Sequence, residues 1–316
     1  MIYSVSSKRG WNRATKRDLI ALKDHDKDFW IRKEVLHALV LGIRDQLVVH
    51  LTGGTGVGKS TLVSVLPKNW RNLCRNIGIE YRNLVVLPVP LIHYQGPEEL
   101  FTRRAIQNNG TCDEDRPPLL AAKKAMKLNG QHDVIIWFQE VGRTPPSVQN
   151  SLISGFLTDP FYDHNGKNLG RLDACVLMDS NYQDKDNGNY LLHELDAALQ
   201  SRFTLQLTLD YLDQDMEKRV LRELIDVPQD QLEKLVQFTH QLRESKRAGD
   251  YKSVPFPTFR QYVALGKQAK WPDFEMEEAL RTVFYGGAGQ GDREKLDSEV
   301  KNLFRDIDPD SSTKTS

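Results

Sequence analysis

The chain contains a series of short apolar runs separated by polar or helix-like stretches. Each run is about as long as a strand and apolar throughout, which is typical of strands buried on both faces of a parallel sheet. Segments with helical spacing lie between the runs, so the pattern predicts an α/β fold in which helices flank the sheet. The runs cover residues 47–51, 84–89, 134–138, 174–178 and 203–207.

Apolar residues at helical spacing predict helices over 29–43, 121–128 and 146–156. An Asn-Gly pair at 165–166 predicts a hairpin turn. After residue 210 the strand pattern stops, and amphipathic helical segments follow. The order predicts an αβα core over 29–210 and a small all-helical lid domain over 211–307. The later helices are expected at 231–243, 258–269, 277–285 and 294–304.

Both ends of the chain are polar. Residues 1–28 are basic and predict a solvated arm, and residues 308–316 predict a disordered tail. The start lacks the long apolar segment of a signal peptide, and no apolar run reaches membrane-spanning length. Three cysteines without a C-x-x-C pair suit a reducing compartment. We therefore expect a cytoplasmic protein with no membrane contact.

The first apolar run leads into a Gly-rich loop with the spacing G-x-x-x-x-G-K-S, after which a helix begins. Such a loop turns its backbone N–H groups toward phosphate oxygens, and the helix N-terminus adds partial positive charge. Lys59 is expected to reach the β- and γ-phosphates, and Ser60 to ligate Mg²⁺. The predicted nucleotide-binding residues are Gly53, Gly54, Thr55, Gly56, Val57, Gly58, Lys59, Ser60 and Thr61.

The run at 134–138 ends in Gln139 and Glu140, where most sites of this kind have Asp-Glu. The Asp normally holds Mg²⁺, and the Glu polarises the attacking water. Gln139 still accepts a hydrogen bond from a metal-bound water, but it supplies no charge, so metal affinity is expected to fall. Glu140 remains as the candidate general base. The other reading of this dipeptide is a surface pair after a core strand.

Three further polar residues are candidates for the same site. Asn181 follows the next apolar run and is placed to orient the attacking water, although an Asn after a strand is often only a turn residue. Arg202 stands at a helix-to-strand junction and is a candidate arginine finger toward a neighbouring subunit's nucleotide. Arg260 opens a helix of the lid and is a candidate γ-phosphate contact. For both arginines the alternative is an ordinary surface residue.

Together these residues resemble the AAA+ ATPases and, within them, the MoxR-like branch. The strongest local match is the segment 139–152, Q-E-V-G-R-T-P-P-S-V-Q-N-S-L, which is similar to that branch's D-E-I-N-R-A-P-P-x-x-Q-x-x-L. The resemblance covers residues 29–270. Two positions depart from it, because Gln139 replaces the family Asp and Gly142 replaces the usual Asn.

The resemblance implies roles for the candidates: Lys59 and Ser60 as Walker A, Gln139 and Glu140 as Walker B. It also implies Asn181 as sensor 1, Arg202 as arginine finger and Arg260 as sensor 2. With ATP and Mg²⁺ as cofactors, such proteins form a ring, usually a hexamer. The ring acts as a chaperone-like machine on a protein partner, often one with a von Willebrand factor A domain.

In the same family the segment after the second strand faces the central pore. Residues 93–101 occupy that place here, and their aromatic and acidic side chains are suited to grip a partner. A packed loop and helix is the alternative reading. Residues 108–118 predict an exposed loop.

Other functions remain open at this stage. A nucleotide-gated scaffold with weak hydrolysis follows if Gln139 weakens Mg²⁺ binding. A McrB-like DNA-directed motor is disfavoured, because 43 acidic and 43 basic residues balance and leave no nucleic-acid footprint, although the basic arm keeps it open. The sequence has no N-K-x-D guanine-reading segment, which disfavours a Ras-type GTPase. A small-molecule kinase would have no use for Arg202 and Arg260.

Overall fold

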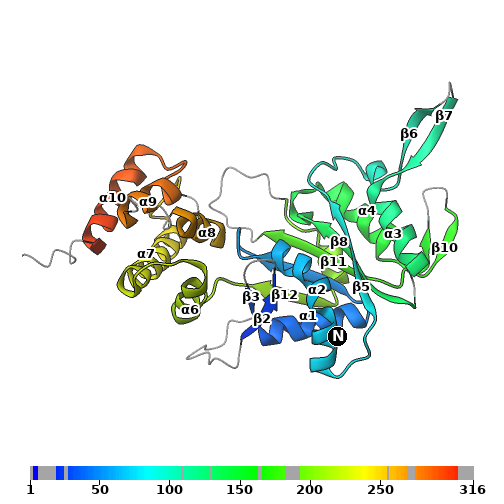
Figure 1. Ribbon diagram of the computed structural model, residues 1–316. Helices are drawn as coiled ribbons and strands as arrows, with labels where there is room; N and C mark the ends of the chain where they lie inside the picture. Colours follow the sequence, from blue (N-terminus) through cyan, green and yellow to red (C-terminus); the bar gives the residue numbers. More distant parts are fainter. Residues whose placement is uncertain are drawn as a thin grey trace, which may run out of the picture. The chain divides into compact units, whose positions relative to one another are not determined.

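The computed structural model (Figure 1) describes residues 3–5, 19–24, 28–107, 110–128, 130–162, 166–181, 193–254, 256–268 and 275–304. The chain divides into two compact units. One lies within residues 1–54 and 58–210, and the other within residues 55–57 and 211–316. The tail at 308–316 lies outside the described residues.

A six-stranded sheet forms the centre of the first unit, in the order β1-β12-β4-β11-β8-β5. Every pairing in it is parallel. The expected α/β architecture, with a parallel sheet followed by a helical part, is confirmed. The strands are β1 (Tyr3–Val5), β4 (Val48–Gly53), β5 (Asn83–Pro90), β8 (His132–Gln139), β11 (Cys175–Asn181) and β12 (Leu205–Leu209).

The helices around this sheet are α1 (Lys33–Arg44), α2 (Lys59–Ile77), α3 (Pro117–Leu128), α4 (Pro146–Phe156) and α5 (Ala197–Arg202). Helix α2 packs on β5, α3 on β8, and α1 on β12. The middle of β8 is buried on both faces, which explains why its sequence is apolar without alternation. Side chains of one face of β8 join β11, α3 and α4 in one core: Val134, Ile136, Phe138, Met178, Leu119 and Leu152.

The strand order decides where polar strand ends meet. Strand β4 lies between β12 and β11, and β11 lies between β4 and β8. Because the three strands β4, β11 and β8 are parallel, their carboxyl ends lie at one edge of the sheet. The Gly-rich loop, Asn181 and the Gln139-Glu140 pair all follow these ends.

The expectation of a solvated arm over 1–28 is wrong for its described residues. Strand β1 extends the central sheet beside β12, and β2 (Leu19–Lys23) pairs with β3 (Asp28–Arg32) in an antiparallel hairpin. Leu19 and Leu22 are buried. The helix expected from residue 29 therefore begins four residues later, at Lys33, because the preceding residues pair as a strand.

One more segment differs from the sequence-based expectation. Of the loop expected at 108–118, residues 108–109 lie outside the described residues, and the rest forms the second strand of a hairpin and the start of α3; the hairpin pairs β6 (Thr102–Gln107) with β7 (Gly110–Asp115). An ion pair of 2.7 Å between Arg103 and Glu114 joins its strands. In the segment 93–101, Tyr94 and Leu100 are buried and Pro97–Leu100 forms a short 3-10 helix, in line with the alternative prediction of a packed loop and helix. His93, Gln95 and Glu98 in the same segment are exposed.

The Asn-Gly hairpin is present, although its tip at 163–165 lies outside the described residues. Its arms, β9 (Phe161–Tyr162) and β10 (Asn168–Gly170), pair antiparallel as expected. Phe161 is fully buried in the core of the first unit, which anchors the hairpin to that unit.

The second unit is helical, as expected. Its helices are α6 (Gln214–Leu224), α7 (Gln229–Ala248), α8 (Phe259–Gln268), α9 (Met276–Phe284) and α10 (Gln290–Phe304). Helix α6 was not anticipated; the Asp213 side chain caps its N-terminus by accepting a hydrogen bond from Met216 N at 3.0 Å. No described helix is long and apolar enough to cross a bilayer.

A charged cluster lies inside this helical unit. Glu217 is fully buried and accepts two hydrogen bonds from the Arg243 guanidinium, at 2.8 and 2.9 Å. His240 Nε2 lies 2.6 Å from the same carboxylate. Burial alone would raise the pKa of Glu217, but the bonds from His240 and Arg243 outweigh it and lower the pKa. The cluster therefore holds α6 to α7 through a paired, buried carboxylate.

Candidate functional site

The Gly-rich loop runs from the end of β4 to the start of α2. Gly56 and Gly58 have φ of 76° and 97°, in the left-handed region that glycine enters without strain. A Cβ on Gly58 would also lie 2.6 Å from the Phe29 ring. The glycines are thus required by the backbone itself.

Lys59 is held inside this loop. Its Nζ donates to Gly53 O at 2.8 Å, to Gly54 O at 3.1 Å and to Asn181 Oδ1 at 2.7 Å. Burial lowers the pKa of Lys59 to about 8, while the carboxylates of Asp179 and Glu140 oppose that shift. The structure therefore brings Lys59 and Asn181 together, from β4–α2 and from the end of β11.

Glu140 directly follows β8 in an unusual backbone conformation. Its φ of 58° and ψ of 44° place a non-glycine residue in the left-handed region, which stores strain and is common at functional sites. Its carboxylate lies 2.9 Å from Arg143 Nε, three residues further on. The candidate base is thus ion-paired within its own turn in this structure.

Asp179 is a buried carboxylate at the same edge. Its side chain is 4% exposed, and its Oδ1 accepts hydrogen bonds from Trp137 Nε1 at 2.8 Å and from Glu140 N at 3.4 Å. Burial raises the pKa of Asp179, whereas the Trp137 bond and the Lys59 charge oppose that rise.

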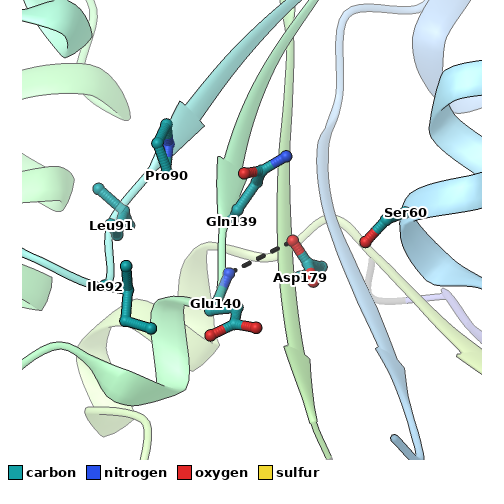
Figure 2. A pocket seen from close by; sticks show the side chains of 7 residues that line it. All are labelled: Ser60, Pro90, Leu91, Ile92, Gln139, Glu140 and Asp179. Carbon is teal, nitrogen blue, oxygen red and sulfur yellow. Dashed lines mark hydrogen bonds between the residues drawn. The ribbon is translucent and has the colours of Figure 1, made fainter. Parts of the chain in front are cut away.

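A pocket of about 200 Å³ opens where these elements meet. Figure 2 shows its lining side chains, which come from the start of α2, from the segment after β5, and from the ends of β8 and β11. Its polar lining consists of Ser60, Gln139, Glu140 and Asp179, and its apolar wall of Pro90, Leu91 and Ile92. Three carboxylate or amide side chains and one hydroxyl thus share one small space.

Gln149, in the motif segment, links the Glu140 region to the helix that carries Arg202. It is fully buried, its Nε2 donates to Thr144 O at 3.0 Å, and its Oε1 accepts from Asp196 N at 2.8 Å. Asp196 caps α5, whose last residue is Arg202. Arg202 itself is exposed and makes no ion pair with the part of the chain that the structure describes.

The remaining candidates are placed as follows. Ser60 is exposed at the start of α2, and Thr61 follows it in the first turn. Arg260 is the second residue of α8, but its side chain lies outside the described residues. The roles of all site residues stay predictions.

Sequence reasoning missed three residues of this site. Asp179 had a signal, since it is an acidic residue inside an apolar strand and shares a strand face with Asn181, two positions on. For Arg143 and Gln149 the sequence carries no signal beyond their place in the motif segment. The partner of Arg143 is set by the turn after β8, and that of Gln149 by the start of α5.

His50 gives the site region an expected acid sensitivity. It lies on β4, stacks on Phe203 at 4.4 Å between ring centroids, and its Nε2 is 2.9 Å from Ser180 Oγ. Burial lowers its pKa from 6.5 to about 4. The unfolded chain therefore takes up this proton first, so His50's contribution to stability is complete above pH 6.5 and is lost as pH falls through 4.

We expect the free energy of unfolding to fall by about 3 kcal/mol more in the wild type than in His50→Gln between pH 6.5 and 4. Urea denaturation of both proteins across this range measures the difference, and other acid-labile groups cancel because both share them. Equal pH slopes would show that His50 is not the responsible group.

Comparison with known protein families matches the part of the chain that carries this site. The sequence model of the AAA domain (dynein-related subfamily) matches residues 48–203. A sequence comparison with curated proteins finds no match.

Solved structures with a related shape include a candidate ATPase from Cytophaga hutchinsonii, at 14% identity and TM-score 0.37, covering 87% of this chain and 89% of that one. A chain of the E. coli MS115-1 HORMA:CdnC:Trip13 complex is 17% identical at TM-score 0.43, with 79% and 77% covered. NtrX from Brucella abortus in complex with ADP is 14% identical at TM-score 0.37, with 79% and 47% covered. At these identities and TM-scores, the likenesses bear on neither activity nor partner.

Proposed function

We propose that the AAA+ domain formed by residues 48–203 binds Mg-ATP and hydrolyses it within a ring of identical subunits that remodels, assembles or activates a protein partner. The observation that supports the nucleotide chemistry best is the meeting of Lys59, Asn181 and Glu140 at one sheet edge, beside a loop whose glycines adopt left-handed conformations.

Each of these residues has a task in that reaction. The loop amides and Lys59 hold the phosphates, which requires Lys59 to exchange its present acceptors, Gly53 O and Gly54 O, for phosphate oxygens. Asn181 orients the attacking water, and Glu140 accepts its proton. Glu140 must first leave Arg143, since its carboxylate is ion-paired there now.

The pocket fits a magnesium ion by the chemistry of its donors. Ser60 offers a hydroxyl oxygen, Gln139 an amide oxygen, and two carboxylates line the same space. Oxygen ligands are what Mg²⁺ prefers, usually one or two carboxylates together with substrate phosphates and waters. When bound, Mg²⁺ neutralises the negative charge of the reacting phosphates.

The ring and the protein partner are proposed from the motif segment 139–152. The segment 139–152 is similar to that of the MoxR-like branch, so we propose the MoxR-like kind of hexamer and a partner such as a von Willebrand factor A protein. The exposed Arg202 at the end of α5 supports sharing of the site, because an arginine finger must be free to reach a neighbour.

A mixing experiment tests the shared site. Arg202→Ala is expected to lower turnover by about 10²-fold, because it removes positive charge from the transition state of the neighbouring site. Mixed with Lys59→Ala, which keeps its arginine, it should regain activity above the sum of the two variants. Arg75→Ala, an exposed arginine on α2, is the matched control and should leave turnover unchanged. Absence of rescue, or a monomer in ATP by light scattering, would refute the ring.

A nucleotide-gated scaffold is the second candidate function. The ion pair between Glu140 and Arg143 favours it, because a base held by an arginine does not accept a proton from water. Under this alternative the protein binds ATP and assembles but turns over ATP only at a very low rate. The rate of ATP hydrolysis in a single turnover at saturating Mg²⁺ separates the hydrolysing ring from the scaffold.

A further inference from the structure

Gln139, at the end of β8, carries no carboxylate, but the neighbouring strand β11 carries one at Asp179. We infer that Asp179, on β11, is the residue that anchors Mg²⁺ in this site in place of the usual carboxylate at the end of β8. The inference rests on the proposed Mg-ATP binding and assigns the metal-anchoring role to a residue outside the phosphate-loop and strand-end motifs.

Strand register brings Asp179 to the required place. Strands β8 and β11 are parallel neighbours, with Met178 opposite Phe138. The next residues, Asp179 and Gln139, therefore share one face of the sheet at adjacent strand ends. On its other side β11 pairs with β4, where Asp179 lies opposite Leu51, two residues before the Gly-rich loop begins. Asp179 thus stands between the loop strand and the strand of Gln139.

The pocket confirms that the side chain points toward the other metal donors. Asp179, Gln139 and Ser60 line the same opening, from β11, β8 and α2 (Figure 2). Among the described residues, no group of three or more His, Cys, Asp or Glu side chains is placed to hold a metal by itself. Mg²⁺ is usually held by one or two carboxylates together with substrate phosphates and waters, so a single anchoring carboxylate suffices here.

The carboxylate is also oriented as a metal-anchoring group. Within the described chain both of its hydrogen bonds, from Trp137 Nε1 and from Glu140 N, end at Oδ1. Oδ2 is thereby left to accept from a metal-bound water. Hydrogen bonds of this kind fix the direction of a metal-binding carboxylate, so loss of the donor groups also lowers metal affinity.

The charge balance of the pocket calls for a cation. A carboxylate that is 4% exposed is costly unless a positive charge compensates it. The nearby positive charge is that of Lys59, while Arg143 is paired with Glu140. If Lys59 turned to the phosphates, Asp179 would lose part of that compensation, which a Mg²⁺ ion held with the nucleotide would supply.

The test follows metal binding directly. Binding of a fluorescent ADP analogue is titrated with Mg²⁺, and Mn²⁺ with ADP is followed by electron paramagnetic resonance. Asp179→Asn is expected to raise the Mg²⁺ concentration at half-maximal effect by about 10- to 100-fold. Binding of the analogue in EDTA should persist. Adding Gln139→Asp to Asp179→Asn moves the carboxylate back to β8 and should restore the Mg²⁺ response.

The outcomes distinguish this inference from the proposed function. If the wild type does not bind the analogue with Mg²⁺ present, the proposed function fails. If the wild type binds with a Mg²⁺ response that Asp179→Asn leaves unchanged, Asp179 is not the anchor and the proposed function stands. If Asp179→Asn does not fold, Gln139→Asp alone decides: the inference expects little change in Mg²⁺ affinity, and a tightening of tenfold or more overturns it.

Discussion

Glu140→Gln is expected to lower ATP turnover by about 10²- to 10⁴-fold, the usual contribution of a positioned general base. The amide cannot accept the proton of the attacking water, yet it has nearly the same shape as the carboxylate. ATP affinity should therefore stay within a few-fold of the wild type, and the variant should remain bound to ATP. Phosphate release under saturating Mg-ATP, together with equilibrium binding of a fluorescent ATP analogue, measures both quantities.

Glu98→Gln is the matched control, since Glu98 is an exposed carboxylate in the segment after β5. It should leave turnover and binding unchanged. The variant Arg143→Ala adds a second check, because it frees Glu140 from its present ion pair. Normal turnover in Glu140→Gln would remove Glu140 from the role of base, whatever the control shows.

Lys59→Ala is expected to weaken ATP binding, the step that precedes hydrolysis. Charge-assisted hydrogen bonds contribute about 1.5–3 kcal/mol each, so ATP affinity should fall on the order of 10- to 100-fold. The same lysine stabilises charge that develops on the phosphates, so hydrolysis at low ATP concentration should fall by roughly 10³- to 10⁴-fold. Isothermal titration calorimetry and turnover at low ATP check the two effects.

Lys68→Ala controls for loss of a positive charge from the same helix, because Lys68 is exposed on α2. Circular dichroism must show that Lys59→Ala keeps its helix content, since the side chain also bonds Gly53 O and Gly54 O. Wild-type ATP affinity in a folded Lys59→Ala protein would exclude this loop as the phosphate site.

Local patterns predicted the elements whose sequence carries its own signal. Strands β8 and β11 were found because they are buried on both faces and therefore apolar throughout. Strand β5 lies at the edge of the sheet and alternates between buried and exposed residues, but its sequence is still a short apolar run. The amphipathic helices α7 and α9 were found because one face of each is buried in the helical unit. In both cases the buried positions must be apolar, so the spacing of apolar residues along the sequence shows which element forms.

Elements stabilised by distant partners were missed. Strand β1 has three residues and exists because it pairs with β12, about two hundred positions away along the chain. The hairpin of β6 and β7 carries an exposed ion pair between Arg103 and Glu114, so its sequence resembles a polar loop. Neither β1 nor the hairpin of β6 and β7 is marked by its own local sequence, because pairing with another strand decides whether such segments form strands.

The sequence by itself predicted a nucleotide phosphate site, because the Gly-rich loop, Lys59 and Ser60 lie within eight consecutive residues and need only their own backbone. It also determined that Gln139 supplies no charge. Only the tertiary structure decided how that loss is offset. Asp179 is forty residues from Gln139 in sequence, and the two share a pocket because β11 lies beside β8 in parallel register. Strand order is set by the packing of the whole sheet, so no short segment encodes it.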